Sequence, residues 1–295
     1  MGNTEPATAA HIRPLRQDDV EAALRLSASA QWNQNADDWS VMLQLGQGWG
    51  VEAPDDQGRT QLAASVVALP YGEHFAWTSM VLVLPEFRRR GLAQLLLRHA
   101  LAHLAALGRA AVLDATPAGH AVYAQEGFAD TWGFARYRRE ANASLQGPAA
   151  GPVTRPLAEA DWPAIHVLDR AAFGASRLPL LRHLAARLPP AARVLEQGGR
   201  IRGFVLGRDG REARQIGPLL ADAPDVAQRL LHDALQSVAG CAVYVDLHDR
   251  HADLLPWLQQ QGFAFQRPFT RMVRGATEAP GEPSTIVLAA GPELG

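Results

Sequence analysis

The stretch Met80-Val-Leu-Val-Leu-Pro-Glu-Phe-Arg-Arg-Arg-Gly-Leu-Ala-Gln94 decides the fold of this sequence. Its apolar beginning predicts a strand that ends at Pro85, and Gly91 begins a helix one short turn later. A helix that begins there directs free backbone N–H groups and the positive end of its dipole at the turn. Three arginines add positive charge, and the small Gly91 leaves the backbone accessible. The turn is predicted to bind an anion such as a pyrophosphate; the alternative is a basic, exposed turn without a ligand.

Around this turn, hydrophobic periodicity predicts alternating strands and helices. Strands are expected at 12–15, 61–69, 76–84, 110–115 and 128–138, and helices at 19–26, within 32–45, at 91–107 and at 118–125. Asp18 or Asp19 can cap the first helix, and Gly108 closes the long one. The pattern predicts an α/β (α+β) fold with a central mixed sheet flanked by helices.

The pattern occurs twice along the chain. Gly127-Phe-Ala129 and Phe134-Ala-Arg136 recur as Gly262-Phe-Ala264 and Phe269-Thr-Arg271, both 135 residues later. An Arg-Pro-Leu triplet at 13–15, followed by an aspartate, likewise recurs at 155–157. Two units in tandem explain this arrangement.

The predicted domains are residues 1–145 and residues 153–275. A linker rich in proline and glycine joins them at 146–152. Residues 276–295 form a second linker and a tail, in which 286–288 are expected to add one strand.

Composition limits the class of protein. A net charge of −2 provides no basic field, so nucleic acid is not an expected partner. All basic residues are arginine, which excludes lysine chemistry such as Schiff bases. The single cysteine, Cys241, is expected to be a buried apolar residue; one cysteine builds neither a disulfide framework nor a cysteine zinc site, and no metal is expected. No signal peptide and no apolar run of about 18 residues is evident, so we expect a soluble, cytoplasmic protein that does not bind a membrane.

The run Arg88-x-x-Gly91-x-Ala93, preceded by Val83-x-Pro85, resembles the coenzyme A motif of the GNAT (GCN5-related N-acetyltransferase) superfamily. The resemblance implies tandem GNAT folds and acetyl-CoA as co-substrate. In that family the turn holds the pyrophosphate, and the preceding strand separates from its neighbour to bind pantetheine. The resemblance assigns cofactor contacts to Val81, Leu82, Val83, Arg88, Arg89, Arg90, Gly91, Leu92, Ala93, Gln94, Thr116 and Tyr123.

A second signature lies in Asp114-Ala-Thr-Pro-Ala-Gly-His-Ala-Val-Tyr-Ala-Gln-Glu-Gly-Phe128. It is similar to the family's helix with Tyr-x-x-x-Gly-Phe, which implies that Tyr123 protonates the leaving thiolate. A tyrosine, whose pKa is usually about 10, is protonated at neutral pH. The alternative is a tyrosine that only packs on the next helix.

This sequence departs from the family pattern at two positions. Thr116 stands where many relatives have asparagine, and Ala111 stands where several have a glutamate base. The general base therefore stays unassigned. The candidates are Glu73, His74, Asp38 and Asp114, or a chain of water molecules.

The acceptor pocket is predicted at Trp32-Asn33-Gln34, where an aromatic ring and two amides could line a small polar site. A helix cap beside a core tryptophan is the alternative. The acceptor is expected to be an amine of a small molecule or peptide. The leading hypothesis is an N-acetyltransferase; the rival is an acyl-CoA-binding sensor or scaffold without catalysis.

The second unit lacks both chemical elements. The segment equivalent to the basic turn, residues 215–225, contains two aspartates and no arginine. Leu258 stands at the position equivalent to Tyr123. It resembles the divergent C-terminal GNAT domain of YitH/HolE-type tandem proteins in Phe173-Gly-Ala-Ser-Arg177, Ile216-Gly-Pro218 and Phe269-Thr-Arg-Met272. We expect it either to close the acceptor side of the site or to serve stability alone.

Overall fold

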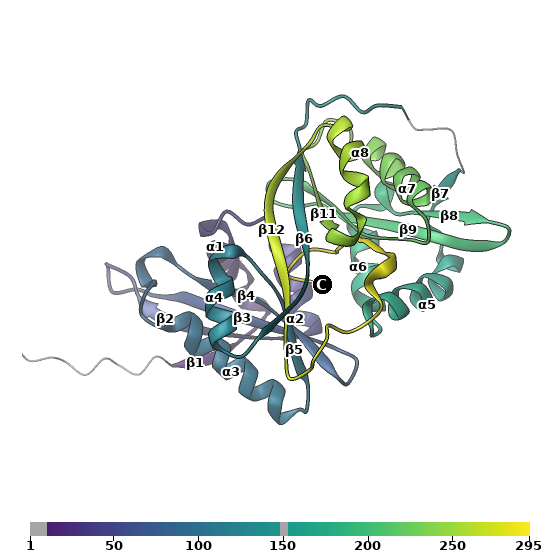
Figure 1. The fold of residues 1–295 in the computed structure, drawn as a ribbon. Coiled ribbons are helices and arrows are strands. Elements are labelled where there is room, and N and C mark those ends of the chain that lie inside the picture. The colour runs from purple at the N-terminus through teal and green to yellow at the C-terminus, as the bar shows by residue number, and fades with distance from the viewer. Residues whose placement is uncertain (1–10, 148–152) are drawn as a thin grey trace, which may run out of the picture.

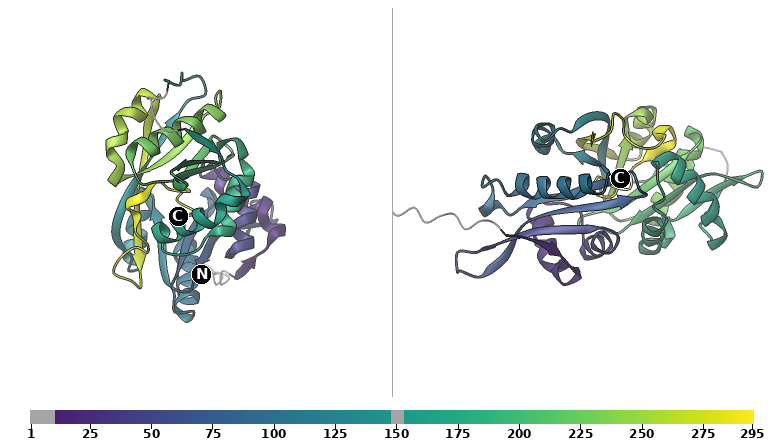
Figure 2. Two further views of the ribbon diagram at one scale, coloured as in Figure 1. Left: turned by 90° about the vertical axis from the view of Figure 1, so that its right-hand side faces the viewer. Right: turned by 90° about the horizontal axis from the view of Figure 1, so that it is seen from below.

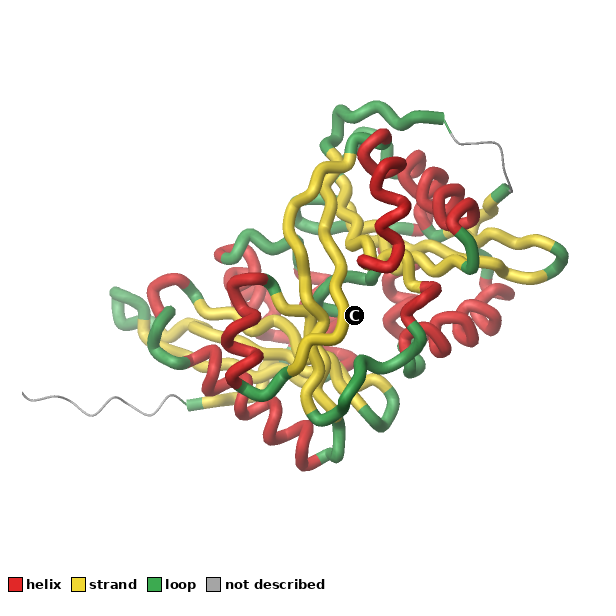
Figure 3. Tube along the Cα trace, viewed as in Figure 1, coloured by secondary structure: helices red, strands yellow, loops and turns green. Residues whose placement is uncertain are grey.

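The computed structural model describes residues 11–147 and 153–295, and its strands form one 13-stranded mixed sheet with helices on both faces (Figures 1, 2 and 3). The first half contains strands β1 (Ile12–Leu15), β2 (Gln47–Pro54), β3 (Thr60–Tyr71), β4 (Phe75–Val83), β5 (Ala110–Ala115) and β6 (Ala129–Arg139) and helices α1 (Val20–Ser29), α2 (Ala36–Leu45), α3 (Leu92–Ala106) and α4 (Pro117–Gln125). The second half contains strands β7 (Thr154–Pro156), β8 (Arg193–Gln197), β9 (Arg200–Arg208), β10 (Arg214–Ala221), β11 (Val243–His248), β12 (Phe263–Arg274) and β13 (Ile286–Leu288) and helices α5 (Trp162–Phe173), α6 (Leu178–Arg187), α7 (Pro224–Ser237) and α8 (Leu255–Gln260).

The predicted α/β fold with a mixed sheet flanked by helices is confirmed. Residues 1–10, and residues 148–152 of the predicted linker, lie outside the described part of the chain. Within that part, no helix is long and apolar enough to cross a membrane.

Strand β2 was not predicted from the sequence. Three glycines between Gly46 and Gly50 weaken the strand pattern there, because glycine is depleted in strands. The structure explains one of them: a Cβ atom at Gly46 would lie 2.4 Å from the backbone carbonyl oxygen of Ala68 in β3. Close packing against this backbone therefore excludes larger residues at Gly46, where the chain enters β2.

The strand order crosses between the two halves. It runs β1-β2-β3-β4-β5-β12-β6-β11-β13-β10-β9-β8-β7, so β5 of the first half pairs with β12 of the second, and β11 pairs with β6. Strands β6 and β12 pair with each other in the middle and run as two long ribbons between the halves (Figure 1). Since β6 and β12 are equivalent in the repeat, the two halves exchange equivalent strands.

The repeat extends to individual ion pairs. Arg13 donates to both carboxylate oxygens of Asp19, at 2.9 and 2.7 Å, and also pairs with Glu52. The equivalent Arg155 donates to both oxygens of Asp161, at 2.7 Å each, and pairs with Glu196. In each half the cluster joins the first strand to the helix after it and to the next strand.

Cys241 differs from its expected environment. It is half-buried in the turn before β11, which begins two residues later at Val243. The buried residues of that apolar stretch are those of the strand, and the cysteine lies at its edge.

Candidate active site

Strands β4 and β5 separate partway along their length. Their parallel pairing consists of Phe75 with Ala110, Ala76 with Ala111 and Trp77 with Val112. Beyond Trp77, β4 continues to pair with β3 as far as Val83. The edge of β4 that contains Val81, Leu82 and Val83, the predicted pantetheine strand, is therefore turned to the opening between β4 and β5.

An irregularity in β4 lies at this opening. Met80 has a left-handed backbone conformation, with φ of 53°, and the register between β3 and β4 shifts beside it. The hydroxyl of Ser65 donates to the carbonyl oxygen of Met80 at 2.8 Å. A buried side chain thus supports a backbone conformation that is uncommon outside glycine.

The predicted anion-binding turn connects β4 to α3. A single 3-10 turn at Pro85–Phe87 leads into Arg88, Arg89 and Arg90, which are all exposed. Gly91 adopts a φ of 77°, and α3 begins at Leu92, one residue later than predicted. A Cβ atom added to Gly91 would meet no other atom within 4 Å, so the space beside this backbone is open to a ligand.

The helix that begins at this turn has 15 residues. Its first N–H groups, among them those of Leu92 and Ala93, have no intrahelical partner and point at the turn. The side chain of Gln94, by contrast, is directed to Glu126, whose Oε1 atom it contacts at 2.6 Å. The backbone of the predicted cofactor residues 91–94 is thus better placed than their side chains for anion binding.

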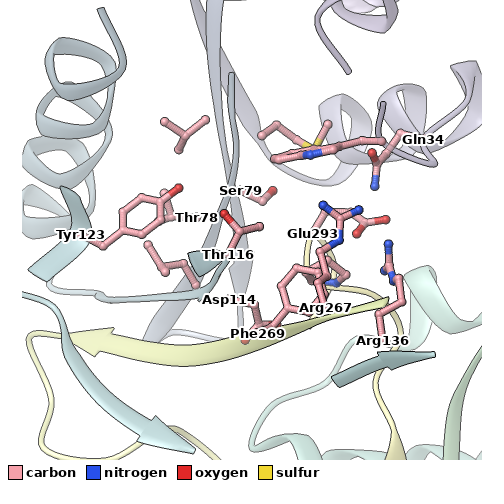
Figure 4. Close-up of a pocket in the computed structure, with 15 residues that line it drawn as sticks. Gln34, Thr78, Ser79, Asp114, Thr116, Tyr123, Arg136, Arg267, Phe269 and Glu293 are labelled. Atoms are coloured by element: carbon pink, nitrogen blue, oxygen red, sulfur yellow. The ribbon is translucent and has the colours of Figure 1, made fainter. Parts of the chain in front are cut away.

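A pocket opens where β4 leaves β5 (Figure 4). It contains about 500 Å³ of space, open solvent at its mouth included. It is lined by Trp32, Gln34, Thr78, Ser79, Met80, Val81, Leu113, Asp114, Thr116, Tyr123, Arg136, Arg267, Phe269, Pro292 and Glu293. The lining residues come from both halves of the chain and from the C-terminal segment.

Tyr123 of α4 directs its hydroxyl into the pocket (Figure 4). Its ring packs edge-on against Phe128, with 6.0 Å between the ring centroids. Burial raises the pKa of Tyr123 to about 12, so the hydroxyl holds its proton at neutral pH. Thr116 also lines the pocket, and as the N-cap of α4 its Oγ1 atom accepts from the N–H of Gly119 at 3.3 Å.

The predicted acceptor segment divides into two parts. Trp32 and Gln34 line the pocket, but Asn33 does not. Its side chain accepts from the N–H groups of Glu212 and Ala213 at 2.9 and 3.0 Å and donates to the carbonyl oxygen of Ala213 at 3.0 Å. Asn33 therefore holds the β9–β10 connection of the second half against the first half.

None of the four candidate general bases both lines the pocket and is free of ion pairs. Glu73 and His74 are exposed in the turn between β3 and β4, and Asp38 forms ion pairs with two arginines outside the pocket lining. Asp114 lines the pocket, but Arg271 donates to both of its oxygens, at 2.8 and 2.9 Å.

Several lining residues were not predicted as site residues from the sequence, although Arg136 and Phe269 lie in the repeated motifs. Two are the hydroxyls of Thr78 and Ser79, whose Oγ atoms are buried without a hydrogen-bond partner among the described residues. The others are Arg136, Arg267 and Phe269 on the two central strands and Glu293 in the tail. The last three lie more than 140 residues beyond Tyr123. The exchange of strands brings Arg267 and Phe269 to the pocket, and the C-terminal segment brings Glu293.

The corresponding opening in the second half is filled. Strands β10 and β11 also share three parallel pairs, from Arg214–Val243 to Ile216–Val245. Strand β13 then enters between them, so that Leu288 pairs with both Leu219 and Leu247. Leu258, at the position equivalent to Tyr123, is fully buried. The chain itself thus occupies the place that is open in the first half.

The described residues contain no group of three or more histidine, cysteine, aspartate or glutamate side chains arranged to hold a metal ion.

Comparisons with known proteins agree with this architecture. Two family models, both described as acetyltransferase (GNAT) domains, match residues 53–130 and 165–287. No curated protein sequence gives a significant match. Among solved structures, a candidate acetyltransferase from Pyrococcus horikoshii has a TM-score of 0.79 at 20% identity and covers 100% of this chain and 99% of its own.

Two further structures have the same fold. A GCN5-related N-acetyltransferase from Sphaerobacter thermophilus has a TM-score of 0.64 at 14% identity, covering 94% of this chain and 99% of its own. A tandem GNAT protein from the clavulanic acid biosynthesis pathway has a TM-score of 0.62 at 15% identity, covering 91% and 99%. At these identities the likeness shows the fold alone, while the family models support acyl transfer in general. The chain therefore contains two GNAT acetyltransferase domains in tandem.

Proposed function

We propose that the first half, residues 1–145, is an acetyl-CoA-dependent N-acetyltransferase that acts on an amine of a small molecule or peptide. One observation supports it above all. The opening between β4 and β5 has the start of α3 at one end and the protonated hydroxyl of Tyr123 beside it. This arrangement supports the proposal because a helix N-terminus, a free strand edge and a proton donor lie at the same opening.

The residues fit the cofactor in shape and charge. The pyrophosphate would lie on the turn from Arg88 to Gln94, where the backbone beside Gly91 is open and the arginines supply positive charge. Pantetheine would extend along the edge of Val81–Val83, where backbone groups are available to its amides. When bound, acetyl-CoA supplies a thioester whose C–S bond breaks as the amine nitrogen forms a bond to the acetyl carbon.

The chain's own groups would assist at both oxygen and sulfur. Backbone N–H groups of β4 can stabilise negative charge on the acetyl oxygen, and the unpartnered hydroxyls of Thr78 and Ser79 are available in the same wall. Tyr123 would stabilise the departing sulfur by donating a hydrogen bond to it, and the released thiolate would take up a proton from solvent. The proton lost by the amine leaves to water, because each carboxylate candidate named from the sequence is engaged or distant.

We propose further that the second half binds no coenzyme A and contributes the acceptor wall, as a divergent domain of the YitH/HolE type. Arg267 and Phe269 of β12 already line the pocket. Its own opening is filled by β13, and its turn has Asp222, which pairs with Arg202 at 2.9 Å, where a phosphate would need positive charge.

The test is an assay of free thiol release from acetyl-CoA by the full chain with a panel of amines. Release that depends on the amine, together with an acetylated product in mass spectrometry, supports the enzyme. Tight binding of acetyl-CoA without release by any amine would instead favour the acyl-CoA-binding sensor.

A further inference from the structure

Two buried oxygen atoms at the acceptor end of the pocket lack partners. Glu293 is 2% exposed and Gln34 is 3% exposed, and both line the pocket. The Oε2 atom of Glu293 and the Oε1 atom of Gln34 have no hydrogen-bond partner in the described part of the chain. Both atoms are acceptors, and leaving a buried acceptor without a donor is unfavourable. A ligand that donates hydrogen bonds would satisfy both.

The charges around Glu293 leave an excess of negative charge. Its Oε1 atom accepts from Arg208, which also pairs with Asp38 at 2.6 Å. Asp38 pairs in turn with Arg187, which binds Asp209. Two arginines therefore neutralise three carboxylates. Burial alone would raise the pKa of the Glu293 carboxyl, but Arg208 and Arg136 outweigh it and hold the pKa below its usual range. Glu293 is thus ionised, and a cation is the complementary ligand.

The opposite charge is in excess on the two central strands. Arg136 and Arg267 are cross-strand neighbours in the β6–β12 pairing. Arg136 donates to both oxygens of Asp246, at 2.7 Å each. Arg267, which also lines the pocket, makes no ion pair or side-chain hydrogen bond within residues 11–147 and 153–295, and its Nε atom is buried without a partner. An anion is the complementary ligand here.

Glu293 and Arg267 do not neutralise each other, because no ion pair within 4 Å joins them in the described structure. The pocket therefore has one site for a cation and another for an anion, both beside the opening in which the acetyl group would lie. Figure 4 shows both side chains in the same wall, away from Tyr123.

The backbone around Glu293 is held by residues of both halves. The indole of Trp77 donates to the carbonyl oxygen of Pro292 at 3.0 Å, and the hydroxyl of Tyr71 donates to that of Leu294 at 2.8 Å. Arg177 donates to the main-chain oxygen of Gly295. The segment is thus anchored on both sides of Glu293, which holds its carboxylate at one place in the pocket wall.

We propose, on the basis of the function proposed above, that the acceptor is a small zwitterion of the amino acid type. Its amine binds Glu293 Oε2 and Gln34 Oε1, and its acidic group binds Arg267. Glu293 positions the nitrogen beside β4, the surplus proton of the amine leaves to water, and the neutral nitrogen then attacks the acetyl carbon. The product is an N-acetylated acid.

The experiment compares matched acceptors on the full chain: alanine and phenylalanine, their amides, the corresponding amines without a carboxylate, and 1-aminoethylphosphonate. Wild-type protein is expected to prefer the acids over the amides by about tenfold or more in kcat/KM, because the half-buried Arg267, whose Nε atom has no partner, stays unpaired with the neutral analogue. The phosphonate distinguishes a carboxylate site from a general anion site, and its use at the acid's level would still support the inference.

Variants assign the two charges. Arg267→Gln is expected to raise KM for the acids about tenfold or more and to leave the amides unchanged. Glu293→Gln is expected to raise KM for every amine by a similar factor, with the Kd of acetyl-CoA unchanged. Gln34→Met tests the same amine site if Glu293→Gln, which leaves Arg208 buried with less charge compensation, fails to fold. Glu278→Gln and Arg200→Gln, which change exposed residues of the same types, serve as controls.

The outcomes separate this inference from the function on which it rests. If amines cause thiol release but acids, amides and plain amines react equally well, the inference of a zwitterionic acceptor is wrong, while the proposed acetyltransferase function is supported. If no amine releases thiol, calorimetric titration of alanine and phenylalanine into protein saturated with coenzyme A still decides. Saturable binding that Arg267→Gln weakens supports the zwitterion site, and absence of binding overturns it.

Discussion

Replacing Tyr123 by phenylalanine removes one oxygen atom from the pocket and leaves the ring contact with Phe128 in place. The affinity for acetyl-CoA should therefore change little, and the loss should fall on kcat. General acid catalysis typically contributes about 10²–10⁴-fold. The structure allows this range to be narrowed.

Desolvation raises the pKa of the half-buried Tyr123 to about 12, whereas a thiol has a pKa of about 8.5. Complete transfer of the proton from Tyr123 to the thiolate is thus uphill by about 3.5 pKa units, or roughly 5 kcal/mol. Tyr123 should act mainly by a hydrogen bond to the sulfur that strengthens as charge develops there. We therefore expect a loss near the lower limit, about 10²-fold in kcat, or roughly 2.7 kcal/mol.

The pH dependence has a definite sign. Because the pKa of Tyr123 is raised to about 12, the hydroxyl stays protonated as the pH rises from 7 to 10. The kcat of the wild type should show no alkaline decrease in that interval. The assay is thiol release at saturating amine from pH 6 to 10, with acetyl-CoA affinity measured by calorimetry. Tyr137→Phe, which removes a hydroxyl from a half-buried tyrosine outside the pocket lining, is the matched control. A Tyr123→Phe protein with wild-type kcat at every pH would refute the reasoning.

Three further perturbations test other parts of the structure. Calorimetry with coenzyme A should give one site per chain, since β13 fills the second opening; two sites of similar affinity would contradict this. Changing Arg88, Arg89 and Arg90 together to glutamine should weaken acetyl-CoA binding by about tenfold or more and make the remaining binding less sensitive to salt, and an unchanged Kd across a salt series would exclude the turn as the phosphate site. Asn33→Leu should lower the free energy of unfolding by about 1–3 kcal/mol in urea denaturation, because it removes the bonds to Glu212 and Ala213, while the Kd of acetyl-CoA should not change; the reverse pattern would indicate a ligand contact.

The cofactor side of the site could be predicted from the sequence because its determinants are local. A strand, a turn and a helix that follow one another within 15 residues fix where Gly91 lies relative to β4. Thr116 is the N-cap of the short helix α4 and Tyr123 lies within that helix, so their spacing in the sequence also determines their relative position.

The acceptor side could not be predicted in this way. Arg267 and Glu293 reach the pocket only because β12 pairs with β5 and the tail crosses back to Trp77. Long-range strand pairing leaves no periodicity in the sequence. Asn33 was predicted to line the pocket together with its two neighbours in sequence. It instead binds the backbone of a loop 180 residues away, a contact that the sequence does not indicate.

The exchange of β6 and β12 makes the two halves inseparable as folding units. A fragment ending in the linker would leave β5 without the five residues of β12 that pair with it, from Thr270 to Arg274. Such an unpaired edge favours aggregation. The second half can therefore dispense with a ligand site of its own, and its opening is filled by β13. Deleting it from the gene would, however, remove one wall of the active site in the first half. Mutations in the second half should accordingly be constrained by chemistry that takes place in the first.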